Sequence, residues 1–129
     1  MKIGIVTVGR SDYGIWRSII INLLKKKNFK CSLIVTGSHF SNKFGNTYKE
    51  IKKDGFCKIL KAKIDENYED DSPYSASKII SKISLAIGNI LKRNKFDLIF
   101  LLGDRFEMAS IAINIIPYKI PIKQIFKYH

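Results

Sequence analysis

Three charged side chains of the types used for acid–base chemistry and anion binding lie together at residues 104–107. Asp104, Arg105 and Glu107 follow Gly103 and the segment 97–102, whose residues after Asp97 are all apolar, as is typical of a strand covered on both faces in a parallel sheet. A positioned carboxylate can accept a proton, and a guanidinium can bind a phosphate. Asp104 is therefore the candidate catalytic residue. Helix capping is the ordinary role of an Asp here, and both roles can hold together; Glu107 is assigned to a capping-box-like pattern.

Arg10 lies in a second loop, residues 9–14, after the expected strand 2–8. This loop lacks the full Gly-x-Gly-x-x-Gly of a dinucleotide site and the Lys-Ser/Thr of a P-loop, which disfavours NAD and ATP. A strand-to-helix loop can still bind phosphate through free helix amides and the Arg10 guanidinium. An ordinary surface arginine is the alternative interpretation.

Strand-like and helix-like segments alternate along the chain and predict a doubly wound α/β sheet. The long amphipathic pattern 75–93 is the expected right-handed crossover, which sets the fourth strand beside the first. Ligands of such sheets bind at the carboxyl ends of strands where the strand order reverses. Arg10 is therefore expected to face Asp104 and Arg105 across a crevice. His39, after the second strand 31–35, is expected at the same edge, either as a substrate-binding group or as a surface residue.

Composition favours one globular domain, because the 129 residues are 46% hydrophobic and 12% aromatic. The net charge of +12 raises nucleic acid, anionic membranes and phosphate-bearing ligands as partners. Most lysines, however, cluster at expected helix ends and turns, as at 25–27 and 52–53. No basic stripe with interleaved aromatic residues accompanies them. We therefore expect no nucleic-acid partner.

Cys31 and Cys57 have no metal-like spacing and are predicted to be reduced core thiols, and no metal site is expected. The first apolar segment is too short for a signal peptide. No segment reaches the roughly 20 apolar residues of a membrane span. The expectation is a cytoplasmic protein without membrane contact.

Five segments, in order and spacing, resemble the amino-terminal domain of hydrolysing UDP-N-acetylglucosamine 2-epimerases. They are residues 9–14 (GRSDYG), 36–40 (TGSHF), 44–51 (FGNTYKEI), 54–56 (DGF) and 103–108 (GDRFEM). The resemblance covers residues 1–122. It is closer to the sialic-acid and legionaminic-acid branch, because Gly-Asp-Arg-Phe-Glu replaces the Gly-Asp-Thr pattern of the non-hydrolysing branch.

The resemblance implies a Rossmann-like half of a GT-B-like two-domain fold, with a UDP-sugar bound between the halves. Such enzymes eliminate UDP to give a glycal and then add water, releasing N-acetylmannosamine or a related sugar, without a metal or nicotinamide cofactor. By position, Arg10, Gly14 and Arg105 match residues that contact UDP. Asp104 matches a carboxylate implicated in proton transfer, and His39 joins the substrate-binding candidates through its expected place.

Beyond residue 122 the resemblance ends. Family members continue into a His-x-Gly-Gly-Glu loop and a second domain, whereas residues 123–129 match nothing and are not expected to continue a strand. The interpretation is a domain at 1–122, a non-matching tail at 123–129 and an absent second domain, as in a truncated product. The chain alone is then expected to be inactive. A homo-oligomer or a partner chain supplying the second half stays open, as does a non-catalytic fragment with weak nucleotide or phosphate binding.

Overall fold

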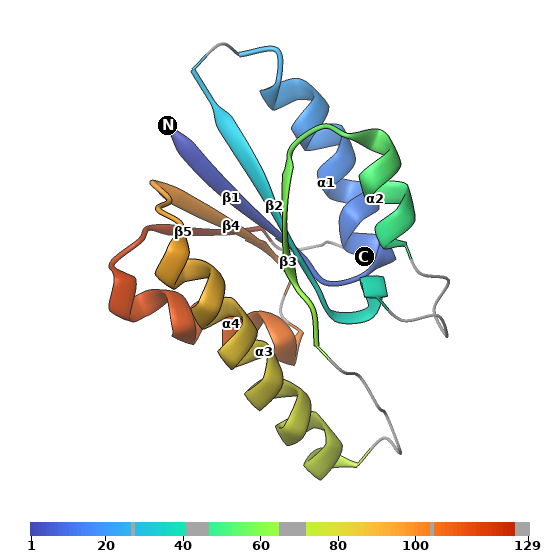
Figure 1. Ribbon diagram of the computed structural model, residues 1–129, viewed down its shortest axis with the longest axis vertical. Helices are drawn as coiled ribbons and strands as arrows, with labels where there is room; N and C mark the ends of the chain where they lie inside the picture. Colours follow the sequence, from blue (N-terminus) through green and yellow to red (C-terminus); the bar gives the residue numbers. More distant parts are fainter. Residues whose placement is uncertain (27, 41–46, 65–71, 104, 126–129) are drawn as a thin grey trace.

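The computed structural model describes residues 1–26, 28–40, 47–64, 72–103 and 105–125 (Figure 1). Helices and strands alternate along the chain, as the sequence predicts. In chain order they are β1 (Lys2–Thr7), α1 (Arg10–Leu23), β2 (Lys30–Thr36), the 3₁₀ turn η1 (Gly37–Phe40), α2 (Tyr48–Asp54), β3 (Lys58–Ala62), α3 (Pro73–Arg93), β4 (Leu98–Leu102), α4 (Phe106–Ile115), the 3₁₀ turn η3 (Ile116–Tyr118) and β5 (Ile122–Ile125).

The five strands form one parallel sheet in the order β3-β2-β1-β4-β5 (Figure 1). This order confirms the predicted doubly wound sheet, in which β1 and β4 are neighbours. The chain moves outward from β1 to β3, crosses back through α3, and continues outward from β4 to β5. The strand order therefore reverses between β1 and β4, where such folds bind ligands.

Helices cover both faces of the sheet: α1 and α2 lie on one face, and α3 and α4 on the other (Figure 1). Successive strand side chains point to opposite faces, so each strand must be apolar on both sides. Alternate residues of β1 accordingly belong to different clusters, with Ile3 and Ile5 packing under α1 and Val6 under α3. This explains the nearly continuous apolar runs in the sequence.

Helix α3 is the predicted crossover, and its sequence defines where it begins. The Ser75 amide donates to the Ser72 hydroxyl at 3.2 Å, and Pro73 occupies the first turn, where it removes no helical hydrogen bond. Ile79, Ile83 and Ile87 recur every four residues and bury one face against the sheet.

Cys31 and Cys57 form a disulfide, so the prediction of two reduced thiols is wrong. Strand register explains the pairing: Ser32 lies opposite Lys58, so the preceding residues of the two chain segments come face to face, with their Cα atoms 5.6 Å apart. The separation of the two cysteines by 26 residues does not by itself predict that they pair. The contact depends on the pairing of β2 with β3.

Strand β5 reaches Ile125, so the expectation that residues after 122 continue no strand is wrong for 123–125. Its residues pair with Ile99–Leu102 of β4, and the Gly103 amide donates to the Ile125 carbonyl at 2.7 Å. Main-chain pairing at a sheet edge needs no strong side-chain pattern. Among the described residues, no helix is long and apolar enough to cross a membrane.

Candidate functional site

The carboxyl ends of β1 and β4 place two of the predicted segments at one edge of the sheet. Ile3 and Ile5 of β1 lie opposite Leu98 and Phe100 of β4 in parallel register, so both strands leave the sheet on the same side. Gly103 turns the chain there with φ +78°, a conformation that favours glycine. Asp104 itself lies outside the described residues, between Gly103 and Arg105. Its catalytic role stays a prediction.

Arg10 is the first residue of α1, so the prediction of a loop through Gly14 is wrong: only Val8 and Gly9 separate strand from helix. The Asp12 carboxylate, buried in the first turn of α1, accepts a hydrogen bond from the Val8 amide at 3.3 Å and closes this short connection. The Arg10 side chain is 76% exposed, with Glu50 at 3.9 Å. Its guanidinium is therefore accessible to an anion.

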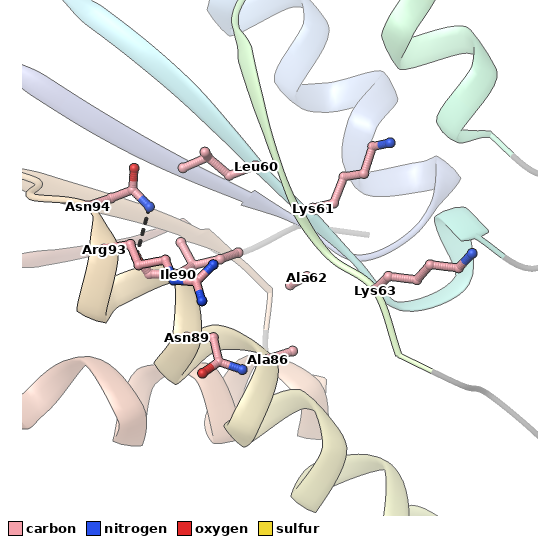
Figure 2. Close-up of a pocket in the computed structure, with 9 residues that line it drawn as sticks. All are labelled: Leu60, Lys61, Ala62, Lys63, Ala86, Asn89, Ile90, Arg93 and Asn94. Atoms are coloured by element: carbon pink, nitrogen blue, oxygen red, sulfur yellow. Dashed lines mark hydrogen bonds between the residues drawn. The ribbon is translucent and has the colours of Figure 1, made fainter.

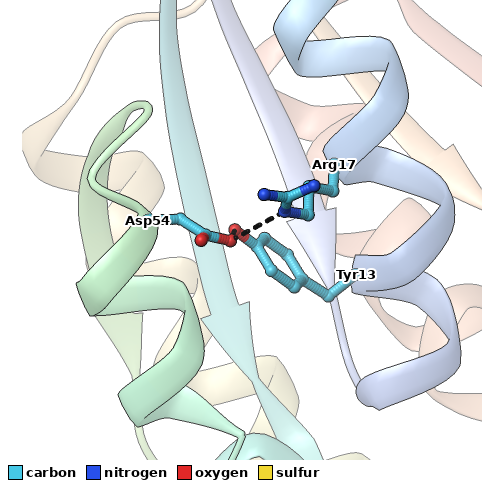
Figure 3. A network of polar contacts seen from close by, with 3 residues as sticks. All are labelled: Tyr13, Arg17 and Asp54. Carbon is cyan, nitrogen blue, oxygen red and sulfur yellow. Dashed lines mark hydrogen bonds and ion pairs between the residues drawn. The ribbon is translucent and has the colours of Figure 1, made fainter.

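A polar network joins α1 to the end of α2 (Figure 3). One Asp54 oxygen, Oδ2, accepts from the Tyr13 hydroxyl at 2.5 Å and from Arg17 Nε at 3.2 Å. Burial, and then the neighbouring Asp54 carboxylate, raise the pKa of Tyr13, so its hydroxyl stays protonated as a donor. The network holds α1, which begins at Arg10, against the end of α2.

An open cavity of about 370 Å³ lies between α1 and α2. Two of the predicted binding residues, Arg10 and Gly14, line it. Apart from its chain neighbours and the backbone of its own helix, no atom of the described chain lies within 4 Å of where a Gly14 Cβ would stand, so no other element fills this space. The lining carries three cationic and two acidic side chains, which suits a ligand with negative charge and polar groups. It consists of Arg10, Tyr13, Gly14, Arg17, Glu50, Lys53 and Asp54.

His39 lies inside the carboxyl edge of β2, where its ring bridges two threonines. Nε2 lies 2.8 Å from the Thr7 hydroxyl and Nδ1 lies 2.6 Å from the Thr47 hydroxyl. Burial lowers the pKa of His39 to about 4, against the smaller opposing effect of Asp12. A neutral imidazole has one donor and one acceptor, and each hydroxyl can complement either. Both ring nitrogens are thus occupied, and the substrate-binding role of His39 stays a prediction.

Gly37, at the start of the turn that carries His39, touches the end of β1. Its φ is +66°, and a Cβ there would lie 2.5 Å from Val8 Cγ1 and 2.6 Å from the Val8 carbonyl oxygen. Only a glycine lets the two chain segments approach this closely. The approach helps to set the exit of β1 toward Arg10.

Arg105 and Glu107 pair at the start of α4, with Arg105 Nη2 3.3 Å from Glu107 Oε1. The Arg105 side chain is 51% exposed, whereas that of Glu107 is 3% exposed. Arg105, rather than Asp104, is the N-cap residue, so the predicted capping box is wrong by one position. Within the described chain, Glu107 Oε2 has no hydrogen-bond partner.

Two further hollows lie away from the predicted site residues. One of about 330 Å³ lies between β3 and α3, near the hydrogen bond from Asn94 Nδ2 to the Ile90 carbonyl (Figure 2). A larger one, about 540 Å³, lies between the end of α3 and the turn before β5. In the described ranges, no group of three or more His, Cys, Asp or Glu residues could hold a metal ion.

Sequence reasoning missed several residues that shape the site. Asp12 stands three residues after Gly9, which is a capping signal that could have identified it. Asp54 has no such local signal, because its contacts with Tyr13 and Arg17 span 41 and 37 residues. The threonines around His39 are likewise brought together only by the folded chain.

The sheet and its switch-point edge define the class: a Rossmann-like domain of the kind that forms one half of a GT-B-like fold. The sequence profile described as "UDP-N-acetylglucosamine 2-epimerase" matches residues 22–125. The chain belongs to this family.

Curated relatives extend the comparison. The chain is 34% identical over 121 residues to "Polysialic acid biosynthesis protein P7" of Escherichia coli, covering 94% of this chain and 30% of that protein. It is 34% identical over 123 residues to "UDP-N,N'-diacetylbacillosamine 2-epimerase (hydrolyzing)" of Legionella pneumophila, covering 94% and 32%. The chain thus spans about a third of the length of these relatives.

A solved structure has the same fold. The UDP-GlcNAc 2-epimerase from Neisseria meningitidis, bound to UDP-GlcNAc, superposes with a TM-score of 0.76 at 17% identity. The superposition covers 96% of this chain and 32% of that one.

Proposed function

We propose that this chain is the amino-terminal, nucleotide-sugar-binding part of a hydrolysing UDP-N-acetylglucosamine 2-epimerase. The observation that supports the proposal is the shared carboxyl edge of β1 and β4, because α1 begins at Arg10 after β1 and α4 is capped by Arg105 after β4. Two guanidinium groups at such an edge suit a diphosphate. Two relatives that are named as hydrolysing 2-epimerases add support.

In the proposed reaction, Arg10 and Arg105 hold the diphosphate, and Gly14 leaves room beside it. Asp104 takes the proton from C2 of the sugar as the C1–O bond to UDP breaks, which gives a glycal. Water then adds across the double bond and releases the 2-epimer, N-acetylmannosamine or a related precursor of nonulosonic acids. These steps need no metal or nicotinamide. They do need a second wall for the cleft, from a second domain or a partner chain.

The alternative function is a non-catalytic fragment with at most weak nucleotide or phosphate binding. The open cavity beside Arg10, enclosed by helices α1 and α2 of a single domain, favours this alternative for the chain by itself. Cytoplasmic location and the absence of a nucleic-acid partner remain predictions.

Binding of UDP tests the proposed site. We expect the 129-residue chain to bind UDP in isothermal titration calorimetry, and to bind uridine, which lacks the phosphates, more weakly. Arg10→Ala is expected to weaken UDP binding about tenfold, because it removes one charge-assisted contact. Arg93→Ala is the matched control, since Arg93 ends α3 and lines the hollow beside β3. Unchanged UDP affinity in Arg10→Ala would remove Arg10 from the site.

Turnover distinguishes the two functions. We expect the purified 129-residue chain to release no UDP from UDP-N-acetylglucosamine, because these residues span only about a third of the length of the curated relatives. Coupled detection of free UDP measures this release. Turnover that disappears in Asp104→Asn would contradict the expectation and would show that the chain is catalytically complete.

A further inference from the structure

Glu107 is a buried carboxylate that the proposed reaction does not use. Its side chain is 3% exposed, and its Oε1 pairs with Arg105 Nη2 at 3.3 Å. Oε2 is buried without a hydrogen-bond partner among the described residues. Because burying a carboxylate is costly unless both oxygens are satisfied, this arrangement is a poor choice for stability alone.

The Arg105–Glu107 pair has one buried and one half-exposed member, which suits a role of Glu107 in orienting Arg105. Glu107 is enclosed, whereas half of the Arg105 side chain faces solvent at the carboxyl edge of β4. A guanidinium has five N–H donors in a rigid fork, so a single contact to Glu107 leaves others for a ligand. A fixed carboxylate behind a half-exposed arginine restricts where that arginine can point.

We propose that Glu107 is a positioning residue for Arg105, holding its guanidinium toward the diphosphate of the nucleotide sugar. This inference rests on the proposed function. It assigns Glu107 no contact with the ligand and no part in proton transfer. It also replaces the helix-capping role, because the N-cap position belongs to Arg105.

A role of Glu107 through its charge and a role in positioning Arg105 predict opposite changes in UDP affinity for Glu107→Gln. If Glu107 acted only through its negative charge, removing that charge beside an anion site would strengthen UDP binding. If Glu107 orients Arg105, the substitution frees the guanidinium and weakens UDP binding. The sign of the change therefore separates the two roles.

The experiment is a double-mutant cycle on the 129-residue chain, with UDP and uridine titrated by calorimetry. We expect Glu107→Gln to weaken UDP binding about fivefold, to leave uridine binding unchanged, and to have no further effect in an Arg105→Ala background. Its thermal unfolding temperature should equal or exceed that of the wild type, because Gln removes a buried charge. Asp97→Asn is the matched control: it makes the same charge change immediately before β4, where the side chain accepts from the Lys2 amide.

Each result has a clear meaning. Unchanged or tighter UDP binding in Glu107→Gln would overturn the inference, and so would an equal loss in the Arg105→Ala background. If Glu107→Gln does not fold, Glu107→Asp takes its place: it keeps the negative charge but shortens the side chain by one methylene, so the loss of UDP binding is expected from positioning alone. Wild-type chain that binds UDP no better than uridine would instead overturn the proposed function, and the inference with it.

Discussion

Lowering the pH from 7 to 4 is expected to remove about 3 kcal/mol from the free energy of unfolding through His39 alone. Burial lowers the pKa of His39 to about 4 in the folded chain, against an ordinary value of 6.5. Between these values the unfolded chain binds a proton that the folded chain does not, so stability falls as the pH falls. Above pH 6.5 the imidazole is neutral in both states, and this contribution is complete.

Urea unfolding at a series of pH values measures this loss, and His39→Gln isolates it from the titration of carboxylates. A glutamine amide can also donate and accept, so it can complement the hydroxyls of Thr7 and Thr47 without titrating. The Asp12 carboxylate, which raises the pKa of His39 slightly, is present in both the wild type and His39→Gln. Equal slopes of stability against pH in the two proteins would show that His39 is not held neutral by the fold.

Ile83→Ala is expected to cost about 2–5 kcal/mol of unfolding free energy, because it removes a large side chain from the core. Ile83 lies in the middle of α3, is fully buried and packs against the sheet. The substitution leaves a cavity that the surrounding strands cannot readily fill. Leu85→Ala is the matched control, because Leu85 is on the same helix and is 71% exposed. Chemical denaturation measures both.

The expected change for Leu85→Ala is within about 0.5 kcal/mol, as for most surface substitutions. Equal costs for Ile83→Ala and Leu85→Ala would mean that α3 does not pack its isoleucine face against the sheet. A loss in Ile83→Ala with a reduced dependence on urea concentration would indicate a change in the unfolded state instead.

The fold was predictable because its signals are local and repeated. The period-four isoleucines of α3 and the apolar run of β4 each identify an element without reference to the rest of the chain. The right-handed crossover rule then places β4 beside β1. That adjacency, confirmed by the strand register, is what brings Arg10 and Arg105 to one edge.

The finer features were not predictable, because they depend on contacts between distant segments. His39 is buried because Thr7 and Thr47, from two other parts of the chain, enclose its ring. Cys31 and Cys57 pair because the register of β2 and β3 aligns them. The spacing from Asp104 to Glu107 predicts a capping box, but the N-cap of α4 is Arg105, and the sequence alone does not say which residue begins the helix.

The contact of Gly37 with Val8 limits how the carboxyl edge of the sheet can vary. At position 37 only the hydrogen atoms of the glycine lie between its main chain and that of Val8. The backbone therefore sets the distance between the two segments. A methyl group added at Gly37 would push Val8 away and so displace Arg10, which follows it in the chain. We therefore expect an open position such as Gly14, where an added Cβ meets no other element, to tolerate a side chain better than Gly37 does.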